Sequence, residues 1–492
     1  MRAERTFDAF IDGNAYAALP SPFFVRTPPT PLRDPYVVAV SPDAAALLDI
    51  DATAFEDPQV VRAFAGSAPL PGASPIAAVY AGHQFGSWVP QLGDGRALLL
   101  GDVRNARGER WEVQLKGSGE TAFSRMGDGR AVLRSTIREF LCSEAMDALG
   151  IPTTRALAII GSDEPVYRET VETAAVLTRL APSFVRFGTF EFFFSRGDRD
   201  ALLTLADWVI DRHFPQIPKN ENRYAAFLRE VVARTARLMA QWQSVGFQHG
   251  VMNTDNMSIL GLTLDYGPFG FMEGYDAEWI CNHSDHLGRY RFSAQPGIGL
   301  WNLNVLAASL DPLIDEAAAT AALGSYEPQL RATYLELSKR KLGLDRWPGD
   351  DYAILGDLLG LMARARADYT LTFRALCSVS AAANAADASF VTAFGAHEND
   401  ASAWLNRYRS ALREQDTPEA ERMTAMRSTN PAYVLRNYLA QAAIERAQRR
   451  DFSEVGRLLA ALRAPFDERP QFEDYAKPAP DWAQSIEVSC SS

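Results

Sequence analysis

The chain has 492 residues, of which 47% are hydrophobic and 22% are charged, a composition typical of a globular protein with a large core. Its 49 Lys and Arg residues against 61 Asp and Glu residues leave a formal net charge of −12, which argues against general binding to nucleic acid or to an anionic membrane. With no apolar run of membrane-spanning length, no signal-type start and only four cysteines, the sequence predicts a cytoplasmic protein held together by its core.

The first 165 residues divide into two parts that differ in composition and in the pattern of apolar residues. Residues 1–75 alternate Pro-rich stretches with short apolar runs, which predicts an N-terminal arm packed over a larger unit. Residues 76–165 place Gly-Asp turns between alternating segments. In W111-E-V-Q-L-K116, Trp111, Val113 and Leu115 share one strand face, so Lys116 is expected on the opposite, polar face.

A helix is predicted over residues 134–149. Its apolar positions form one stripe, and Gly-Ile-Pro follows as a stop signal. The stripe consists of Leu133, Ile137, Phe140, Leu141, Ala145 and Ala148.

The rest of the chain changes from mixed to helical. Residues 166–300 combine strands and helices, 301–463 are nearly all helical, and 464–492 are rich in Pro and charge, which predicts an extended tail. The sequence therefore predicts an α+β protein with a helical C-terminal extension.

The motif Gly-Asp-Gly-Arg-Ala occurs twice, at 93–97 and 127–131. Taken alone, the first copy is most simply a tight hairpin turn. The second precedes the predicted helix, where N–H groups together with Arg130 and Arg134 would favour an anion such as phosphate.

Lys116 and Glu139 form the next candidate pair. An exposed salt bridge is the ordinary interpretation of such a pair. However, Lys116 ends a half-buried strand and runs into K116-G-S-G119, and a lysine oriented by a helix glutamate is how kinases hold nucleotide phosphates.

The segment 249–267 carries the strongest signal. Asn256 and Asp265 flank an apolar run, 257–264, and a hairpin there would bring their oxygen atoms to one Mg²⁺ or Mn²⁺ ion. Turn capping is the alternative for either residue alone. Against the kinase catalytic loop, Val251 occupies the usual base position, which leaves Asp255 as the nearby proton acceptor.

These segments, together with Y80-A-G-H-Q-F-G86, R179-L-A-P-S-F-V-R-F-G188 and N430-P-A-Y-V-L-R-N437, closely resemble the selenoprotein O family over most of the chain. The resemblance implies a protein-kinase-like bilobal fold that binds ATP in a flipped orientation and transfers AMP to protein hydroxyls. It further implies that Glu139 holds Lys116, that Asp255 accepts the proton, and that Asn256 and Asp265 bind the metal. The nucleotide contacts implied are Gly93, Gly95, Arg96, Lys116, Asp128, Gly129, Arg179, Arg186 and Asp265.

The same resemblance implies a redox pair between Cys281 and Cys490. The simpler alternatives are a buried small side chain for Cys281 and a free tail thiol for Cys490. A zinc site at Cys281, His283 and His286 lacks a clear fourth ligand and has tight spacing. Cys142 and Cys377 lie in helical patterns and are expected to be packing residues.

The resulting hypothesis is a monomeric protein adenylyltransferase that uses ATP and Mg²⁺ or Mn²⁺ to place AMP on Ser, Thr or Tyr hydroxyls, its own included. The family resemblance also implies UMP transfer, with UTP as a second donor. Two alternatives remain: a catalytically inactive nucleotide-binding scaffold, suggested by Val251, and a small-molecule phosphotransferase.

Overall fold

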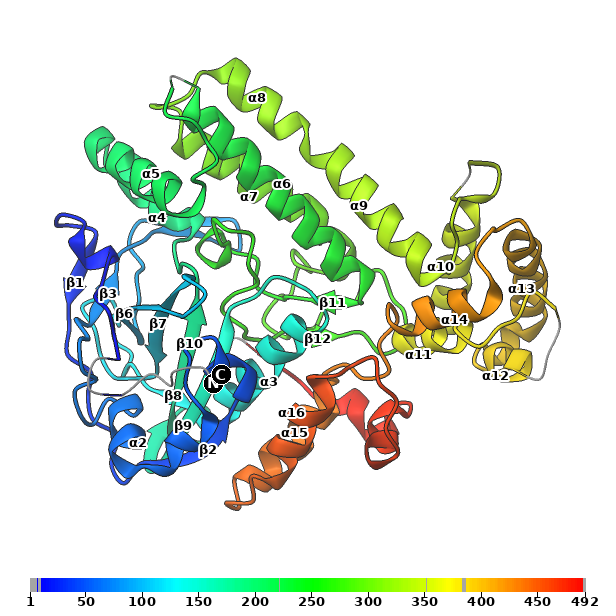
Figure 1. Cartoon of the computed structure of the whole chain (residues 1–492), viewed down its shortest axis with the longest axis horizontal. Helices are drawn as coiled ribbons and strands as arrows, with labels where there is room; N and C mark the ends of the chain where they lie inside the picture. The colour runs from blue at the N-terminus through cyan, green and yellow to red at the C-terminus, as the bar shows by residue number, and fades with distance from the viewer. Residues whose placement is uncertain (1–6, 8–9, 221, 351, 383–385, 490–492) are drawn as a thin grey trace.

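An antiparallel sheet forms the left half of the molecule in Figure 1. The computed structural model describes residues 7, 10–220, 222–350, 352–382 and 386–489. Helices and strands occur together, which confirms the α+β class. The main sheet has eight strands, with β8 beside β10 off the main path. Their order is β1 (Phe24–Arg26), β3 (Ile76–Ala78), β6 (Ala97–Arg104), β7 (Arg110–Lys116), β10 (Val171–Ala181), β9 (Arg155–Tyr167) and β2 (Tyr36–Val40), with β8 spanning Ala131–Val132.

Strand β7 shows how the alternating pattern sets the two faces of the sheet. Val113 and Leu115 are buried in one apolar cluster, which also contains α2 (Pro58–Phe64) and part of α1 (Pro42–Ala46). Helix α3 (Leu133–Ala148) buries Ile137 and Phe140 in the cluster on the other side. Lys116 therefore lies on the face away from Val113, as its place in the alternation predicts.

The N-terminal segment is part of this sheet. It supplies β1 at one edge and β2 at the other, and Phe55 and Phe64 join the cluster behind the sheet. The segment predicted as an arm thus completes the sheet as well as covering it.

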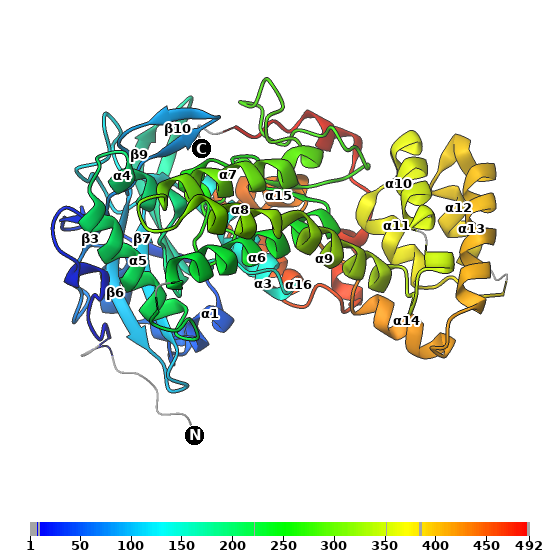
Figure 2. The same ribbon diagram turned by 90° about the horizontal axis from the view of Figure 1, so that it is seen from above.

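Long helices lie beside the sheet and extend away from it (Figures 1 and 2). Helix α6 (Arg223–Ser244) packs along α9 (Tyr326–Lys341). This group comprises α4 (Phe187–Phe194), α5 (Arg199–His213), α6 (Arg223–Ser244), α7 (Gln295–Ser309), α8 (Glu316–Gly324) and α9 (Tyr326–Lys341). Two short pairs, β4 (Gly82–Gln84) with β5 (Ser87–Val89) and β11 (Phe247–Gln248) with β12 (Gly270–Phe271), lie outside the main sheet.

The chain after residue 300 is mostly helical. Five of its helices share a separate core around Phe373, Trp404 and Tyr408 and form the protruding right-hand part of Figure 2. They are α10 (Ala353–Ala365), α11 (Tyr369–Leu376), α12 (Ala386–Thr392), α13 (Glu398–Arg413) and α14 (Glu419–Arg427). The chain then returns, and α15 (Asn437–Ala447) and α16 (Ser453–Leu462) pack on α3.

The predicted extended tail is wrong for much of residues 464–489. Two 3₁₀ turns, Pro470–Ala476 and Asp481–Ser485, interrupt it, and Phe472 and Tyr475 are buried in the main core. The aromatic side chains drive this packing because burying each one removes a large apolar area from water.

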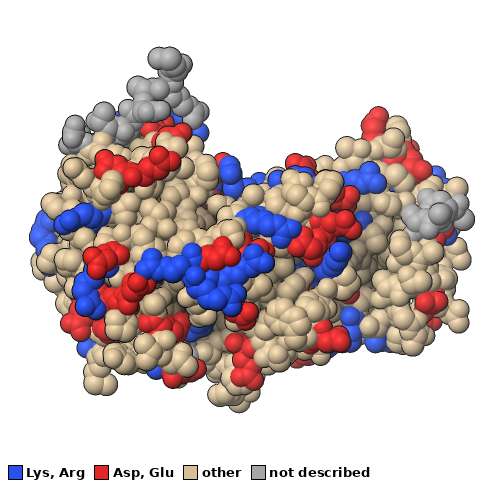
Figure 3. Space-filling view, turned by 90° about the horizontal axis from the view of Figure 1, so that it is seen from below, with Lys and Arg blue, Asp and Glu red and all other residues tan. Residues whose placement is uncertain are grey.

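Basic and acidic side chains alternate on the face shown in Figure 3, where blue and red areas adjoin one another. Arg450 pairs with Asp163, and Arg457 pairs with Asp474 at 2.6 Å. In the part of the chain described here, no helix combines the length and apolar character needed to cross a bilayer.

Candidate active site

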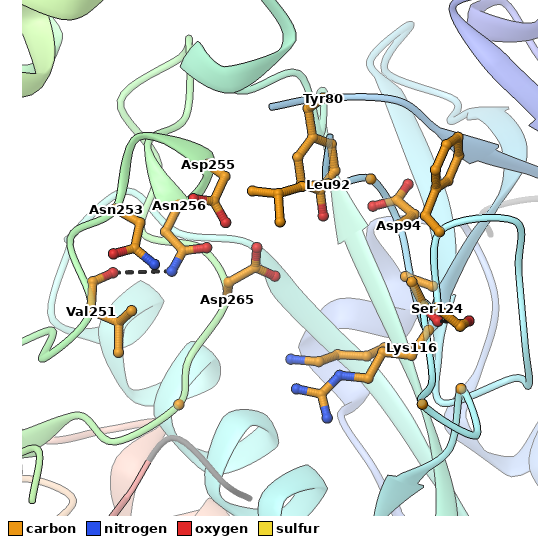
Figure 4. Close-up of a pocket in the computed structure, with 18 of the residues that line it drawn as sticks. Tyr80, Leu92, Asp94, Lys116, Ser124, Val251, Asn253, Asp255, Asn256 and Asp265 are labelled. Carbon is orange, nitrogen blue, oxygen red and sulfur yellow. Dashed lines mark hydrogen bonds between the residues drawn. The ribbon is translucent and has the colours of Figure 1, made fainter. Parts of the chain in front are cut away.

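A cavity of about 600 Å³ opens beside the sheet, where β6, β7 and β10 meet the loops that follow β11. Both Gly-Asp-Gly-Arg motifs reach it, and so do Lys116 and the loop carrying Asp255 (Figure 4). Every residue named above as a nucleotide or metal contact lines this cavity. Segments more than 100 residues apart in sequence therefore form one site.

Lys116 and Glu139 form a buried ion pair between β7 and α3. Their side chains are 12% and 3% exposed, which rules out the solvated surface salt bridge. Glu139 Oε1 also lies 3.2 Å from a guanidinium nitrogen of Arg179. Burial lowers the pKa of Lys116, and the charge of Glu139 opposes that shift.

Asp265 is held by two arginines from β10 and the start of α4. Arg179 binds one carboxylate oxygen and Arg186 binds the other. Burial opposes ionisation, but Arg186, Arg179 and Lys116 hold the pKa of Asp265 well below its usual range. Its φ of 58° lies in the left-handed region, where non-glycine residues are uncommon and often functional.

Asp255 and Asn256 lie in a 3₁₀ turn, Thr254–Asn256, facing Asp265 in Figure 4. The Asn256 amide nitrogen donates to Val251 O at 3.0 Å, which leaves its oxygen directed toward Asp265. Asp255 Oδ2 accepts from Gln84 Nε2 at 3.2 Å, while Asp255 Oδ1 is buried without a hydrogen-bond partner among the described residues. Burial raises the pKa of Asp255 to about 7, despite the opposing charge of Arg186.

These three side chains suit a hard divalent cation. Asp255 and Asp265 offer carboxylate oxygens and Asn256 offers an amide oxygen, which are the ligand types that Mg²⁺ and Mn²⁺ prefer. By contrast, no three His, Cys, Asp or Glu side chains in the described ranges form a metal-binding group, so the zinc alternative at Cys281 finds no support.

The expected hairpin over 257–264 is wrong. Ser258 bridges Arg186 and Thr263 bridges Thr153, so the strand-like bridges of the segment go to other parts of the chain, and within the segment there is only a turn at residues 258–261. Most of its residues are buried, and buried backbone groups must find partners wherever neighbouring elements offer them.

In both Gly-Asp-Gly-Arg motifs a glycine lies so close to a neighbouring segment that a side chain would not fit. A β-carbon on Gly93 would lie 2.4 Å from the Phe123 ring, and one on Gly129 would lie 2.1 Å from Gly119. The first copy is not a tight hairpin turn, because its flanking strands β5 and β6 do not pair with each other. Asp128, in the second copy, forms a 2.8 Å ion pair with Arg168.

The expectation that Arg130 and Arg134 add charge to an anion site holds for neither in full. Arg130 lines the cavity, but its guanidinium donates to Thr30 O and binds Glu164. Arg134 is not among the residues that line the cavity, and it binds Glu172 at 2.9 Å.

Three further polar residues that the sequence did not predict as site residues also line the cavity: Gln84, Asp94 and Asn253. Burial raises the pKa of Asp94, and its carboxylate accepts from Ala78 N at 3.1 Å. The available signal was the polar and glycine-rich Y80-A-G-H-Q-F-G86, which stands out in an apolar stretch.

Cys490 lies outside the described residues, so its pairing with Cys281 is not tested. Cys281 is buried, with its sulfur 2.7 Å from Pro268 O. The tail runs beside this segment, since His283 N donates to Val488 O at 2.8 Å. Cys142 and Cys377 are buried within helical packing, as expected.

Comparison with known proteins identifies close relatives. A family model described as "Protein adenylyltransferase SelO" matches residues 12–463. A protein named "Protein nucleotidyltransferase YdiU" from Thiobacillus denitrificans is 55% identical over 489 residues, covering 99% of this chain and 100% of that protein. Proteins with the same name from Myxococcus xanthus and Thioalkalivibrio sulfidiphilus are 55% and 54% identical, each covering 97% of this chain and 98% of its own length.

Proposed function

The chain belongs to the SelO family of protein adenylyltransferases and is a nucleotidyltransferase, and from this premise we propose that it transfers AMP from ATP to Ser, Thr or Tyr hydroxyls of proteins. The observation that carries the proposal is the convergence of the buried Lys116–Glu139 pair with Asp255, Asn256 and Asp265 on one cavity. The antiparallel sheet with α3 and the helical region beyond it support a kinase-like, bilobal arrangement around that cavity.

Four cations serve the phosphates in this proposal: Arg96, Lys116, Arg179 and Arg186, all of which line the cavity. Arginine suits this role because its guanidinium remains charged and binds phosphate oxygens in a bidentate manner. Their deep position supports a flipped nucleotide, with its terminal phosphates innermost.

Asn256 and Asp265 would hold Mg²⁺ or Mn²⁺. When bound, such an ion supplies positive charge that neutralises phosphate oxygens. Arg179 and Arg186 keep Asp265 ionised and oriented for that role.

Asp255 would accept the proton of the incoming hydroxyl. The hydroxyl oxygen bonds to the α-phosphorus, the bond from the α-phosphorus to the bridging oxygen of the β-phosphate breaks, and pyrophosphate leaves. A carboxylate with a pKa of about 7 is well matched to take a proton near neutral pH. Asp255 thereby replaces the base that a kinase would carry at Val251.

The test is incubation of the protein and a protein extract with ATP labelled at either the α or the γ phosphate. We expect α label in protein bands and none from γ. Incorporation of γ label alone would show an ordinary kinase and overturn the proposal. Labelled UTP in a parallel reaction tests UMP transfer, and EDTA should abolish labelling.

A catalytically inactive scaffold is the second candidate, and Val251 at the usual base position is what favours it. Asp265→Ala separates the two, since an enzyme should lose transfer while a scaffold should keep partner binding. A small-molecule phosphotransferase, the third candidate, predicts no labelled protein band at all.

A further inference from the structure

The β4–β5 hairpin forms one wall at the mouth of the cavity. Gln84 binds the carboxylate of Asp255, and Phe85 N donates to Asn253 Oδ1 at 3.0 Å. Gln84 and Phe85 line the same cavity as Asp255. A protein hydroxyl that reaches Asp255 therefore passes this hairpin.

Aromatic side chains continue outward from the hairpin. The rings of Phe85 and Tyr290 lie 5.2 Å apart, and the His83 ring lies 5.0 Å from Trp88 and 5.4 Å from Trp301. Phe85 and Trp88 are each 39% exposed. This surface is thus apolar, solvent-accessible and continuous with the cavity.

One arginine lies on this surface. The Arg289 guanidinium lies 4.7 Å from the Trp301 ring and 5.7 Å from the Tyr290 ring. A β-carbon on Gly86, at the hairpin tip, would be 3.1 Å from Arg289 Cζ. The arginine therefore stands directly against the tip of the hairpin.

Among the described residues Arg289 forms no ion pair with a carboxylate, and its Nε is buried without a hydrogen-bond partner, although its side chain also interacts with the Tyr290 hydroxyl. The nearest acid in sequence, Asp285, accepts the backbone N–H groups of residues 289 and 290 at 3.0 and 2.7 Å. That carboxylate fixes the turn which presents Arg289 and leaves the guanidinium charge for another partner.

We propose that Phe85, Trp88, Arg289 and Trp301 form an acceptor surface, which docks an extended segment of the acceptor protein with a carboxylate near the modified hydroxyl. The apolar rings contact the segment, and Arg289 pairs with its Asp or Glu side chain. Charge complementarity of this kind contributes to specificity and to the rate of encounter. The inference rests on the proposed function, because it presumes a protein hydroxyl as acceptor.

The test uses peptides with a central Ser, Thr or Tyr and either Glu, Gln or Lys at the flanking positions, incubated with α-labelled ATP. For the unaltered protein we expect about fivefold more label in the Glu set than in the Lys set, the size expected for a partly exposed ion pair. Arg289→Glu should reverse this order, and Arg289→Lys should preserve it. Nucleotide affinity should be unchanged in both variants.

Arg331→Glu is the matched control, because Arg331 is exposed on α9 and contacts Tyr352 at 5.6 Å. It changes the net charge equally and should leave the peptide order as it is. Equal labelling of the three sets, an order unaffected by Arg289→Glu, or labelling of extract proteins but of no peptide would overturn the acceptor surface alone. Absence of α label from both peptides and extract would overturn the proposed function and the acceptor surface together.

Discussion

Two carboxylates in one cavity experience opposite environments. Asp265 faces Arg179 and Arg186, which hold its pKa well below the usual range. Asp255 is buried with one unpartnered oxygen, and its pKa is raised to about 7. Environments that separate the pKa values of neighbouring carboxyls are typical of sites that divide ion binding from proton transfer.

Asp255→Asn should lower the transfer of AMP by about 10²- to 10⁴-fold, because the amide cannot accept the hydroxyl proton. Nucleotide affinity should change little, since the phosphates are assigned to the four cations of the cavity and not to Asp255. Label incorporation and calorimetric titration with ATP measure the two quantities. Asp311→Asn, at an exposed position, is the control, and a fully active Asp255→Asn protein would remove Asp255 from the mechanism.

Glu112 gives a pH-dependent prediction about stability. Burial raises its pKa to about 8, while its Oε2 accepts the N–H of Phe184 at 2.9 Å. The pKa of this group is near 4.5 in the unfolded chain and about 8 in the folded protein. Between these pH values Glu112 is ionised in the unfolded chain and still protonated in the folded protein. Stability from this group is therefore complete below pH 4.5 and decreases as pH rises toward 8.

Glu112→Gln should remove that loss. The free energy of unfolding of the variant minus that of the unaltered protein should increase from pH 5 to pH 8, by at most about 1.4 kcal/mol per pH unit. Above pH 8 this difference should stay constant. Urea unfolding at three pH values measures the difference. Exposed Glu445→Gln should show no such trend, and a pH-independent difference for Glu112→Gln would contradict the buried, protonated state.

At the scale of elements, the β4–β5 hairpin holds the loop of residues 253–256 by backbone and side-chain contacts together. His83 N donates to Thr254 Oγ1 at 2.7 Å, and Gln84 and Phe85 bind the residues on either side. Gly82 lies so close to the loop that a β-carbon would be 2.8 Å from Asp255 Oδ1. The hairpin thus sets the position of Asp255, the proposed proton acceptor.

Gly82→Ala should therefore lower kcat by about tenfold or more, because small displacements of a reacting group are costly. The affinity for ATP should be retained. Gly356→Ala is the matched control, because it lies in α10 with open space around it and should raise helix stability by about 0.5–1 kcal/mol without affecting transfer. Normal kcat in Gly82→Ala would show that the hairpin is not a positioning element.

At the scale of the whole molecule, distant parts of the chain meet around α3. Arg138 on this helix donates to Phe269 O at 2.8 Å and to Asn437 at 3.2 Å, and α16 packs beside it. The C-terminal tail then runs along the segment around residue 283, where His283 N donates to Val488 O. Helices α15 and α16 therefore support the same helix that carries Glu139, whereas the tail contacts a different segment.

This arrangement supports the proposed bond between Cys281 and Cys490. We expect oxidised protein to take up two fewer alkyl groups per chain than reduced protein when treated with iodoacetamide, as measured by mass spectrometry. Cys490→Ser should abolish the difference, whereas Cys142→Ser should leave it. Equal masses for the oxidised and reduced protein would exclude the bond.

Local periodicity was enough to predict several elements correctly. The alternation in β7 placed Lys116 opposite Val113, and the 3.6-residue period placed the apolar stripe of α3, because both patterns depend only on neighbours along the chain. Motifs and resemblance also selected residues that now share one cavity.

Contacts between distant segments required the tertiary structure. Arg130 and Arg134 were expected to attract an anion, but they pair with Glu164 and Glu172. The 257–264 run was expected to form a hairpin, but its bridges go to Arg186 and Thr153. The hydrogen bond from Gln84 to Asp255 likewise joins two segments that are far apart in the sequence. Partners of buried charges and backbone groups are chosen by which elements pack together, and no short stretch of sequence contains that information.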